Sequence, residues 1–231
     1  MPKGMLDSFA LQQQSMQFVV ADLSAGTGMG VSLAALGAIV FGALSASTEY
    51  RRGSMAFSSL AEPRRLTLIA TKVAAVTIAA ALTAVPLALC KGLALALGLT
   101  SQGISSLIDP VELVSLWGRG AIALILLALL GFGIGLITRS QVACFAIAFG
   151  GLLAESTART LGALISGGQT SAASFLPFGL VADAVRGTSF GGLNLASIGM
   201  AAGLLTLAAW AIALLSGGVV RFIRSDVPTS G

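Results

Sequence analysis

Apolar runs alternate with short polar segments along most of the 231-residue chain. A transmembrane helix needs about 20 mostly apolar residues, and five runs come close to that length. They cover residues 28–47, 68–90, 119–137, 142–159 and 196–217. This pattern predicts an all-α, polytopic integral membrane protein in which residues 1–231 form one transmembrane domain of about five helices.

Residues 1–27 contain no run that could cross a bilayer. They also lack the features of a signal peptide, because Lys3 is the only basic residue before a stretch that Asp7 and several glutamines interrupt. We therefore expect this segment to lie outside the membrane, ahead of the first span.

The composition supports the membrane class and excludes several kinds of chemistry. Apolar residues make up 56% of the chain and charged residues only 10%, with a mean hydropathy of +0.96, whereas a soluble domain keeps about a quarter of its residues charged. Histidine is absent, which removes histidine metal sites and Ser-His-Asp triads. With no catalytic set, no metal site and no G-x-x-x-x-G-K-[ST] sequence for binding ATP, we expect a protein that is not an enzyme and binds no cofactor itself.

The net charge of +4 reflects membrane topology rather than a nucleic-acid partner. Basic residues cluster in the loop between the first two spans, in the turn between the third and fourth, and in the C-terminal tail. These residues are Arg51, Arg52, Arg64, Arg65, Lys72, Arg139, Arg221 and Arg224. Because Lys and Arg are enriched in cytoplasmic loops, we expect a cytoplasmic C-terminus, an outer N-terminus and contact with lipid of the cell membrane.

The loop of residues 48–67 has an internal order that a topology signal does not require. Glu49 is followed by Arg51 and Arg52, and Gly53 permits a sharp bend. Ser54 can cap a short amphipathic helix over residues 54–61 that suits a membrane surface. Pro63 ends that helix, and Arg64 and Arg65 follow. The simpler alternative is a positively charged loop with no partner.

The stretches Glu49–Ser54 and Leu60–Arg65, followed by Lys72, resemble permease subunits of the ABC-2 type transporter family. The Phe175–Pro177 segment and the tail from Arg221 to Asp226 agree with that resemblance, which covers about residues 28–226. It implies that the helix over residues 54–61 docks on a separate ATP-hydrolysing subunit, where ATP and Mg²⁺ would bind. It also implies a second permease subunit, in a homodimer or a heterodimer. The residues that it assigns to ATPase coupling are Glu49, Arg51, Arg52, Gly53, Ser54, Phe57, Leu60, Pro63, Arg64 and Arg65.

The family usually has six spans per subunit, so the first of them has no counterpart among the five predicted here. Either the chain is short at its N-terminus or this member lacks that helix. Two other functions stay open: an ion-coupled secondary transporter, and a membrane scaffold that transports nothing. The first would need titratable groups near the membrane midplane, and the sequence offers one candidate.

That candidate is Glu155, the only acid deep inside a predicted span, with Arg159 four residues later. The spacing places both on one helix face in the favourable order for an ion pair. A charge inside the membrane suggests function, so the two residues could line a translocation pathway. Glu155 is about 21 Å along its helix, however, and a structural pair near the outer interface is the alternative.

Four smaller features complete the predictions. Asp109, Pro110 and Glu112 indicate a helix start, and the Gly-x-x-x-Gly pattern in residues 131–135 indicates close packing between helices or between subunits. The segment around Pro177 and Gly179 predicts either a broken helix buried in protein or an ordinary outer loop. The two cysteines should be buried and unreactive, without a disulfide between them.

Overall fold

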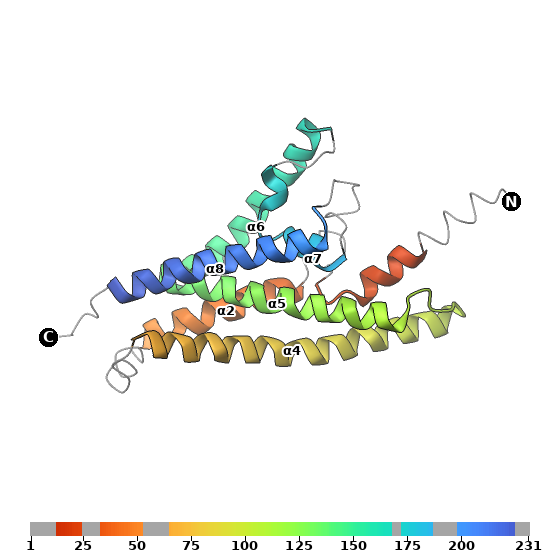
Figure 1. Cartoon of the computed structure of the whole chain (residues 1–231), viewed down its shortest axis with the longest axis horizontal. Helices are drawn as coiled ribbons and strands as arrows, with labels where there is room; N and C mark the ends of the chain where they lie inside the picture. The colour runs from red at the N-terminus through yellow and green to blue at the C-terminus, as the bar shows by residue number, and fades with distance from the viewer. Residues whose placement is uncertain (1–12, 25–32, 53–64, 168–171, 187–197, 225–231) are drawn as a thin grey trace.

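The computed structural model describes residues 13–24, 33–52, 65–167, 172–186 and 198–224 (Figure 1). Within these ranges the chain is helical and contains no strand. The elements are α2 (Leu33–Arg52), α4 (Arg65–Gln102), α5 (Pro110–Thr138), α6 (Gln141–Ile165), the 3-10 helix η1 (Ala172–Phe175), α7 (Leu180–Arg186) and α8 (Met200–Arg224). A further short helix covers residues 13–21. The prediction of an all-α, polytopic membrane protein is confirmed.

Four helices are long and apolar enough to cross a membrane, namely α4, α5, α6 and α8. They correspond to the last four predicted spans. The first predicted span corresponds to α2, whose apolar part, Leu33–Thr48, is shorter. Residues 28–32, where that span was predicted to begin, lie outside the described residues.

Several helices extend beyond the spans predicted for them. The α4 helix continues to Gln102 instead of stopping near residue 90, and it contains Pro86 without ending there. Residues 92–99 are mostly Leu and Ala, which favour helix. Likewise α8 includes Arg221 and Arg224, which we predicted to lie in a tail after the span. The 38 residues of α4 extend about 57 Å, so this helix is longer than the hydrocarbon core, about 30 Å thick.

The start of α5 and its turn into α6 follow the sequence prediction. Asp109 is the N-cap of α5, and its carboxylate accepts a hydrogen bond from the Val111 backbone N–H at 2.8 Å. At the other end Arg139 adopts the left-handed conformation (φ 55°) that closes a helix, and Ser140 then caps α6. This turn reverses the chain within two residues, which makes α5 and α6 neighbours.

The N-cap of α5 gives a first testable prediction. Replacing Asp109 with alanine should lower the free energy of unfolding by about 1 kcal/mol, because the first turn of α5 loses a hydrogen-bond acceptor. Thermal unfolding of the purified protein in detergent measures this loss. Asp109→Asn is the matched control, since asparagine caps helices equally well. Equal loss of stability in both variants would contradict the capping role.

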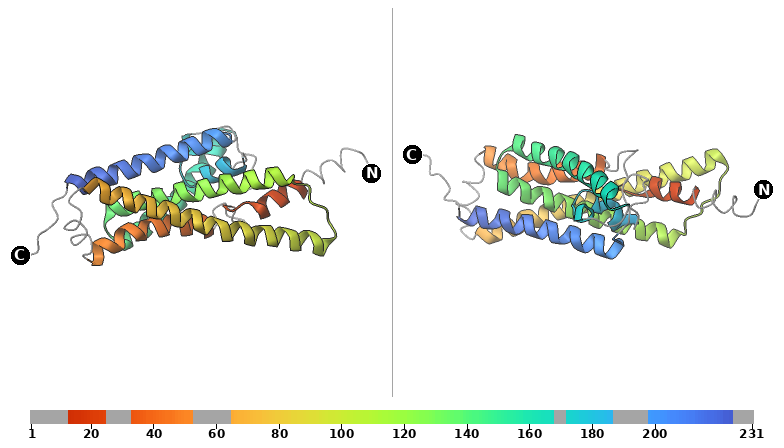
Figure 2. Two further views of the ribbon diagram at one scale, coloured as in Figure 1. Left: turned by 60° about the horizontal axis from the view of Figure 1, so that its bottom comes forward. Right: turned by 90° about the horizontal axis from the view of Figure 1, so that it is seen from above.

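The α5 helix is the centre of the bundle. Of its apolar window, 67% is buried inside the protein, compared with 17% in α4, 17% in α6 and 22% in α8. In Figure 2 it runs lengthwise through the molecule, with α2 and α8 on opposite sides of it. The outward faces of α4, α6 and α8 are therefore left to lipid, which suits their apolar composition.

Glycines on α5 allow its two closest neighbours to touch its backbone. A Cβ on Gly131 would lie 2.0 Å from the Ile39 carbonyl oxygen of α2, and one on Gly135 would lie 2.5 Å from that of Ala43. On the opposite face, a Cβ on Gly133 would lie 2.7 Å from the backbone of Leu214 in α8. The predicted close packing is confirmed, and it operates between helices of one chain.

The C-terminal ends of α2, α5 and α8 meet the N-terminal ends of α4 and α6 at one end of the bundle, which we call the basic end (Figure 1). Ala46 of α2, Leu68 of α4 and Phe222 of α8 share one apolar cluster there. The Arg139 guanidinium also donates to the Arg221 carbonyl at 3.4 Å. The predicted grouping of the basic regions on one side is confirmed. We call the opposite end the far end.

The cysteine prediction holds in part. Cys90 and Cys144 form no disulfide, and Cys144 is buried beside the Thr138 hydroxyl at 3.0 Å. Cys90 is exposed, so the expectation that it is buried is wrong. It lies on the outward face of α4, where lipid takes the place of a protein neighbour.

Candidate functional site

A carboxylate and a guanidinium lie side by side inside the protein on α6. Arg159 Nε lies 3.1 Å from Glu155 Oε1, and the two side chains are only 6% and 5% exposed. The helical spacing of four residues brings them together, as predicted from the sequence. Burying two charges at this depth is costly unless further polar contacts accompany the pair.

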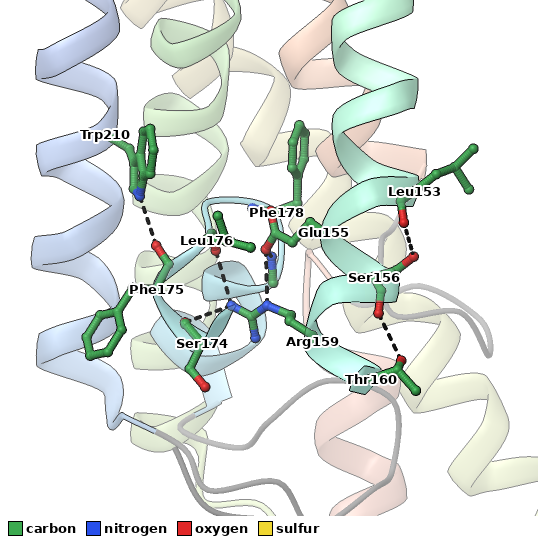
Figure 3. Close-up of polar contacts among 11 residues, drawn as sticks. Leu153, Glu155, Ser156, Arg159, Thr160, Ser174, Phe175, Leu176, Phe178 and Trp210 are labelled. Carbon is green, nitrogen blue, oxygen red and sulfur yellow. Dashed lines mark hydrogen bonds and ion pairs between the residues drawn. The ribbon is translucent and has the colours of Figure 1, made fainter. Parts of the chain in front are cut away.

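Those further contacts come from η1 and from the turn between η1 and α7 (Figure 3). Glu155 accepts hydrogen bonds from the backbone N–H groups of Phe178, at 2.9 Å, and Gly179, at 2.6 Å. Arg159 Nη2 donates to the carbonyl oxygens of Ser174, at 2.8 Å, and Leu176, at 3.1 Å. One ion pair therefore binds four backbone groups, and we call this arrangement the α6 clamp.

The local sequence explains why the segment needs this clamp. Pro177 has no N–H and prevents a continuous helix, so η1 ends, a turn covers residues 177–179, and α7 begins at Leu180. The break leaves backbone donors and acceptors without helical partners, which is costly where water is excluded. The α6 clamp supplies those partners. The structure shows a broken helix at this segment, and its depth relative to the membrane stays a prediction.

Close packing fixes the segment on its other sides. A Cβ on Gly179 would overlap the Arg159 guanidinium, at 2.2 Å from Cζ, so a side chain there would force the guanidinium to move. Residues 180–185 of α7 are all buried. A Cβ on Gly203 of α8 would lie 2.8 Å from the Ala184 nitrogen, and the Trp210 indole N–H donates to the Phe175 carbonyl at 2.9 Å (Figure 3). The α7 helix is thus held between α6 and α8.

The contacts of the α6 clamp favour the structural alternative for Glu155 and Arg159. Both Glu155 oxygens accept hydrogen bonds, and the Arg159 guanidinium donates through Nε and Nη2, all to groups of the same chain. The α6 clamp therefore holds the backbone of residues 174–179 in place inside the bundle. A direct part in lining a pathway stays a prediction.

A second buried ion pair was missed in the sequence. Arg186, the last residue of α7, lies with its Nε 2.9 Å from Oδ2 of Asp22, which is fully buried. Asp22 lies among apolar residues, from Phe18 to Leu23. An acid within an apolar stretch indicates a buried side chain that needs a partner, and this was the signal that the sequence offered. Arg186 gave no signal of its own, because its partner is far away along the chain.

The residues predicted for ATPase coupling lie around the basic end. Glu49, Arg51 and Arg52 are in the last turn of α2, and Arg65 is the first residue of α4. The other six lie outside the described residues: Gly53, Ser54, Phe57, Leu60, Pro63 and Arg64. The structure therefore brings the two flanks of this segment to one end of the bundle.

No group of His, Cys, Asp and Glu residues that could hold a metal ion is found in the part of the chain that the structure describes. The described residues do include two ion pairs on either side of α7, Glu155–Arg159 and Asp22–Arg186, and a further buried acid on that helix, Asp183. No protein-family model, curated protein or solved structure matches this chain.

Proposed function

We propose that this chain is the membrane-spanning subunit of an ATP-driven exporter and that it couples ATP hydrolysis on a separate subunit to movement of a substrate across the membrane. The observation that carries the proposal is the residue order from Glu49 to Arg65, which resembles the coupling segment of ABC-2 type permeases. Its basic pairs, glycine, short amphipathic stretch and proline together describe a docking element.

The fold supports this proposal in two ways. The segment joins α2 to α4 at the basic end, where the α5–α6 turn and the end of α8 also lie. A force applied there would reach α2, α4, α5 and α8 together. In addition, α5 contacts α2 and α8 backbone to backbone, and tightly packed helices move as rigid units between discrete arrangements.

Under this proposal the basic end faces the cytoplasm, in accordance with the enrichment of Lys and Arg on that side of membranes. The partner ATPase binds ATP and Mg²⁺, and a pair of these subunits pushes on the segment of residues 54–61, for which the sequence predicts a short helix. A second permease subunit, identical or related, completes the pathway. The α6 clamp favours this function over an ion-coupled transporter, because both oxygens of the Glu155 carboxylate are occupied by backbone donors of the same chain.

Co-purification with an ATPase tests the proposal. We expect the tagged protein, extracted from its native membrane, to carry a P-loop ATPase that mass spectrometry identifies and that hydrolyses ATP. Glu49→Ala and Arg52→Ala should each lower the amount of bound ATPase, because they remove charges from the docking segment. Arg224→Ala is the matched control, since it removes a charge from the same end but outside that segment. If no ATPase accompanies even the unchanged protein, the coupling function is wrong.

A further inference from the structure

The N-terminal residues 13–24, which we call the strap, lie across the far end of the bundle (Figure 1). The Gln17 side chain accepts from the Leu107 N–H at 2.9 Å and donates to the Ser105 carbonyl at 3.4 Å. The Trp117 indole N–H donates to the Ala21 carbonyl at 3.1 Å. The strap is therefore anchored to the α4–α5 loop and to the first turns of α5.

Below these polar anchors the strap covers the interior of the bundle. Leu23 is buried against Gly120 of α5, where a Cβ would lie 3.1 Å from that of Leu23. Ala21 belongs to the same apolar cluster as Ala123 of α5 and Val181 and Val185 of α7. Ala123 itself is completely buried. The strap and α7 thus meet over a seam whose lower part is apolar.

The polar part of this seam is the ion pair between Asp22 and Arg186. Arg186 Nε forms an ion pair with Asp22 Oδ2 at 2.9 Å, and Asp22 Oδ1 accepts hydrogen bonds from both the backbone N–H and the hydroxyl of Ser24, at 2.7 Å each. Asp22 is fully buried and Arg186 is 17% exposed. The Asp22 carboxylate is therefore fixed from its own side by Ser24 and bound across the seam by one arginine.

The two halves of the seam share α5 but have different polar anchors. The strap is held by α5 and the α4–α5 loop, as described above, whereas α7 packs on α5 and is held in addition by α6 through the α6 clamp and by α8 through Gly203. Separating them would break the Asp22–Arg186 pair and the small apolar contact beneath it, while the anchors of each half stay intact. Arg186 is already partly exposed, so water can solvate it once the pair opens.

We propose that the strap and α7 form a gate at the far end of the bundle and that the Asp22–Arg186 ion pair is the latch that keeps it closed. Only the role of the gate depends on the proposed transport function: it would release substrate at the side opposite the ATPase. The latch itself belongs to this chain and needs no partner subunit to be observed.

The accessibility of a cysteine beneath the strap tests the latch. The reporter is Ala123→Cys in a chain that also carries Cys90→Ser and Cys144→Ala, reconstituted in liposomes and treated with a water-soluble maleimide. Asp22→Asn and Arg186→Gln should each raise the labelling rate of the new cysteine by about tenfold or more, because each leaves one buried charge without its partner. Glu112→Gln, which removes an exposed charge at the far end of α5, should leave the rate unchanged.

A second reporter separates opening of the gate from general unfolding. Cys144 is buried near the basic end, so a chain with Cys90→Ser alone reports on that region. If the ion pair is a latch, Cys144 should stay slow to label in the Asp22→Asn and Arg186→Gln variants. Arg186→Lys keeps the positive charge on a different head group, so it should give an intermediate labelling rate at residue 123. Faster labelling of both reporters in all three variants would overturn the proposal, since the pair would then support the whole fold.

Unchanged labelling at residue 123 in folded Asp22→Asn and Arg186→Gln variants would equally overturn it. Neither result depends on an ATPase. A protein that shows the latch but binds no ATPase would refute the proposed function alone. A protein that binds an ATPase but labels at an unchanged rate would refute the gate alone.

Discussion

Replacing Glu155 with alanine should lower the free energy of unfolding by about 3–5 kcal/mol, the range found when one partner of a buried ion pair is removed. The variant leaves the Arg159 guanidinium buried with no carboxylate beside it. It also leaves the backbone N–H groups of Phe178 and Gly179 without the acceptor that they use now. We expect a large loss of folded protein and early unfolding of the segment between η1 and α7.

Unfolding in detergent, followed by circular dichroism or by loss of a monodisperse peak on heating, measures this effect. Glu112→Ala is the matched control, because Glu112 is an exposed acid on α5, and such surface changes alter stability by roughly 0.5 kcal/mol or less. A double variant with methionine at both 155 and 159 should lose less than the sum of the two single changes, since neither charge is then left alone. Equal losses in Glu155→Ala and Glu112→Ala would refute the α6 clamp.

The second large effect is expected at the contact of α2 with α5. Gly131→Ala should displace α2, because its Cβ would lie 2.0 Å from the Ile39 carbonyl oxygen. Backbone atoms cannot rotate away as a side chain can, so the two helices must separate. We expect a loss of about 1–3 kcal/mol, the usual cost of overpacking a core, and a larger one for Gly131→Val. Gly42→Ala, on the α2 side of the same crossing, should have a similar effect.

The same helix supplies the control for this prediction. Gly118 also lies on α5, and a Cβ there has nothing within 4 Å. Gly118→Ala should therefore be neutral or stabilise the protein by up to about 1 kcal/mol through helix propensity. The yield of monodisperse protein and its unfolding temperature in detergent compare the variants. If Gly131→Ala behaved like Gly118→Ala, the close approach of α2 and α5 would be wrong.

The α7 helix differs from the other helices of the bundle in the contacts that hold it, because an ion pair lies at each of its ends. It is short and buried, and it is tied to α6 through residues just before it and to the strap through its last residue. The transmembrane helices are held mainly by apolar packing and by glycine contacts. Because polar contacts can be exchanged for contacts with water, the polar anchors of α7 distinguish it from the helices that are held by apolar packing.

The sequence alone determined the class of the protein, most of its helices and its charge asymmetry. Hydrophobic runs of membrane length reveal α4, α5, α6 and α8 because the bilayer imposes one requirement on every span. Local rules gave the cap at Asp109 and the turn at Arg139, since each depends on residues within a few positions. The Glu155–Arg159 pair was likewise accessible, because its spacing of four lies within one helix.

The tertiary structure decided what these local features contact. The four backbone partners of the α6 clamp lie 15 to 24 residues from their side chains, and no pattern in the sequence pairs Asp22 with Arg186. The second span was predicted to end near residue 90, yet α4 contains Pro86 and continues to Gln102. Gly131 and Gly133 are two residues apart in the sequence, but only the packing places the first against α2 and the second against α8. Such contacts depend on the positions of whole helices, which the periodicity of a single segment does not contain.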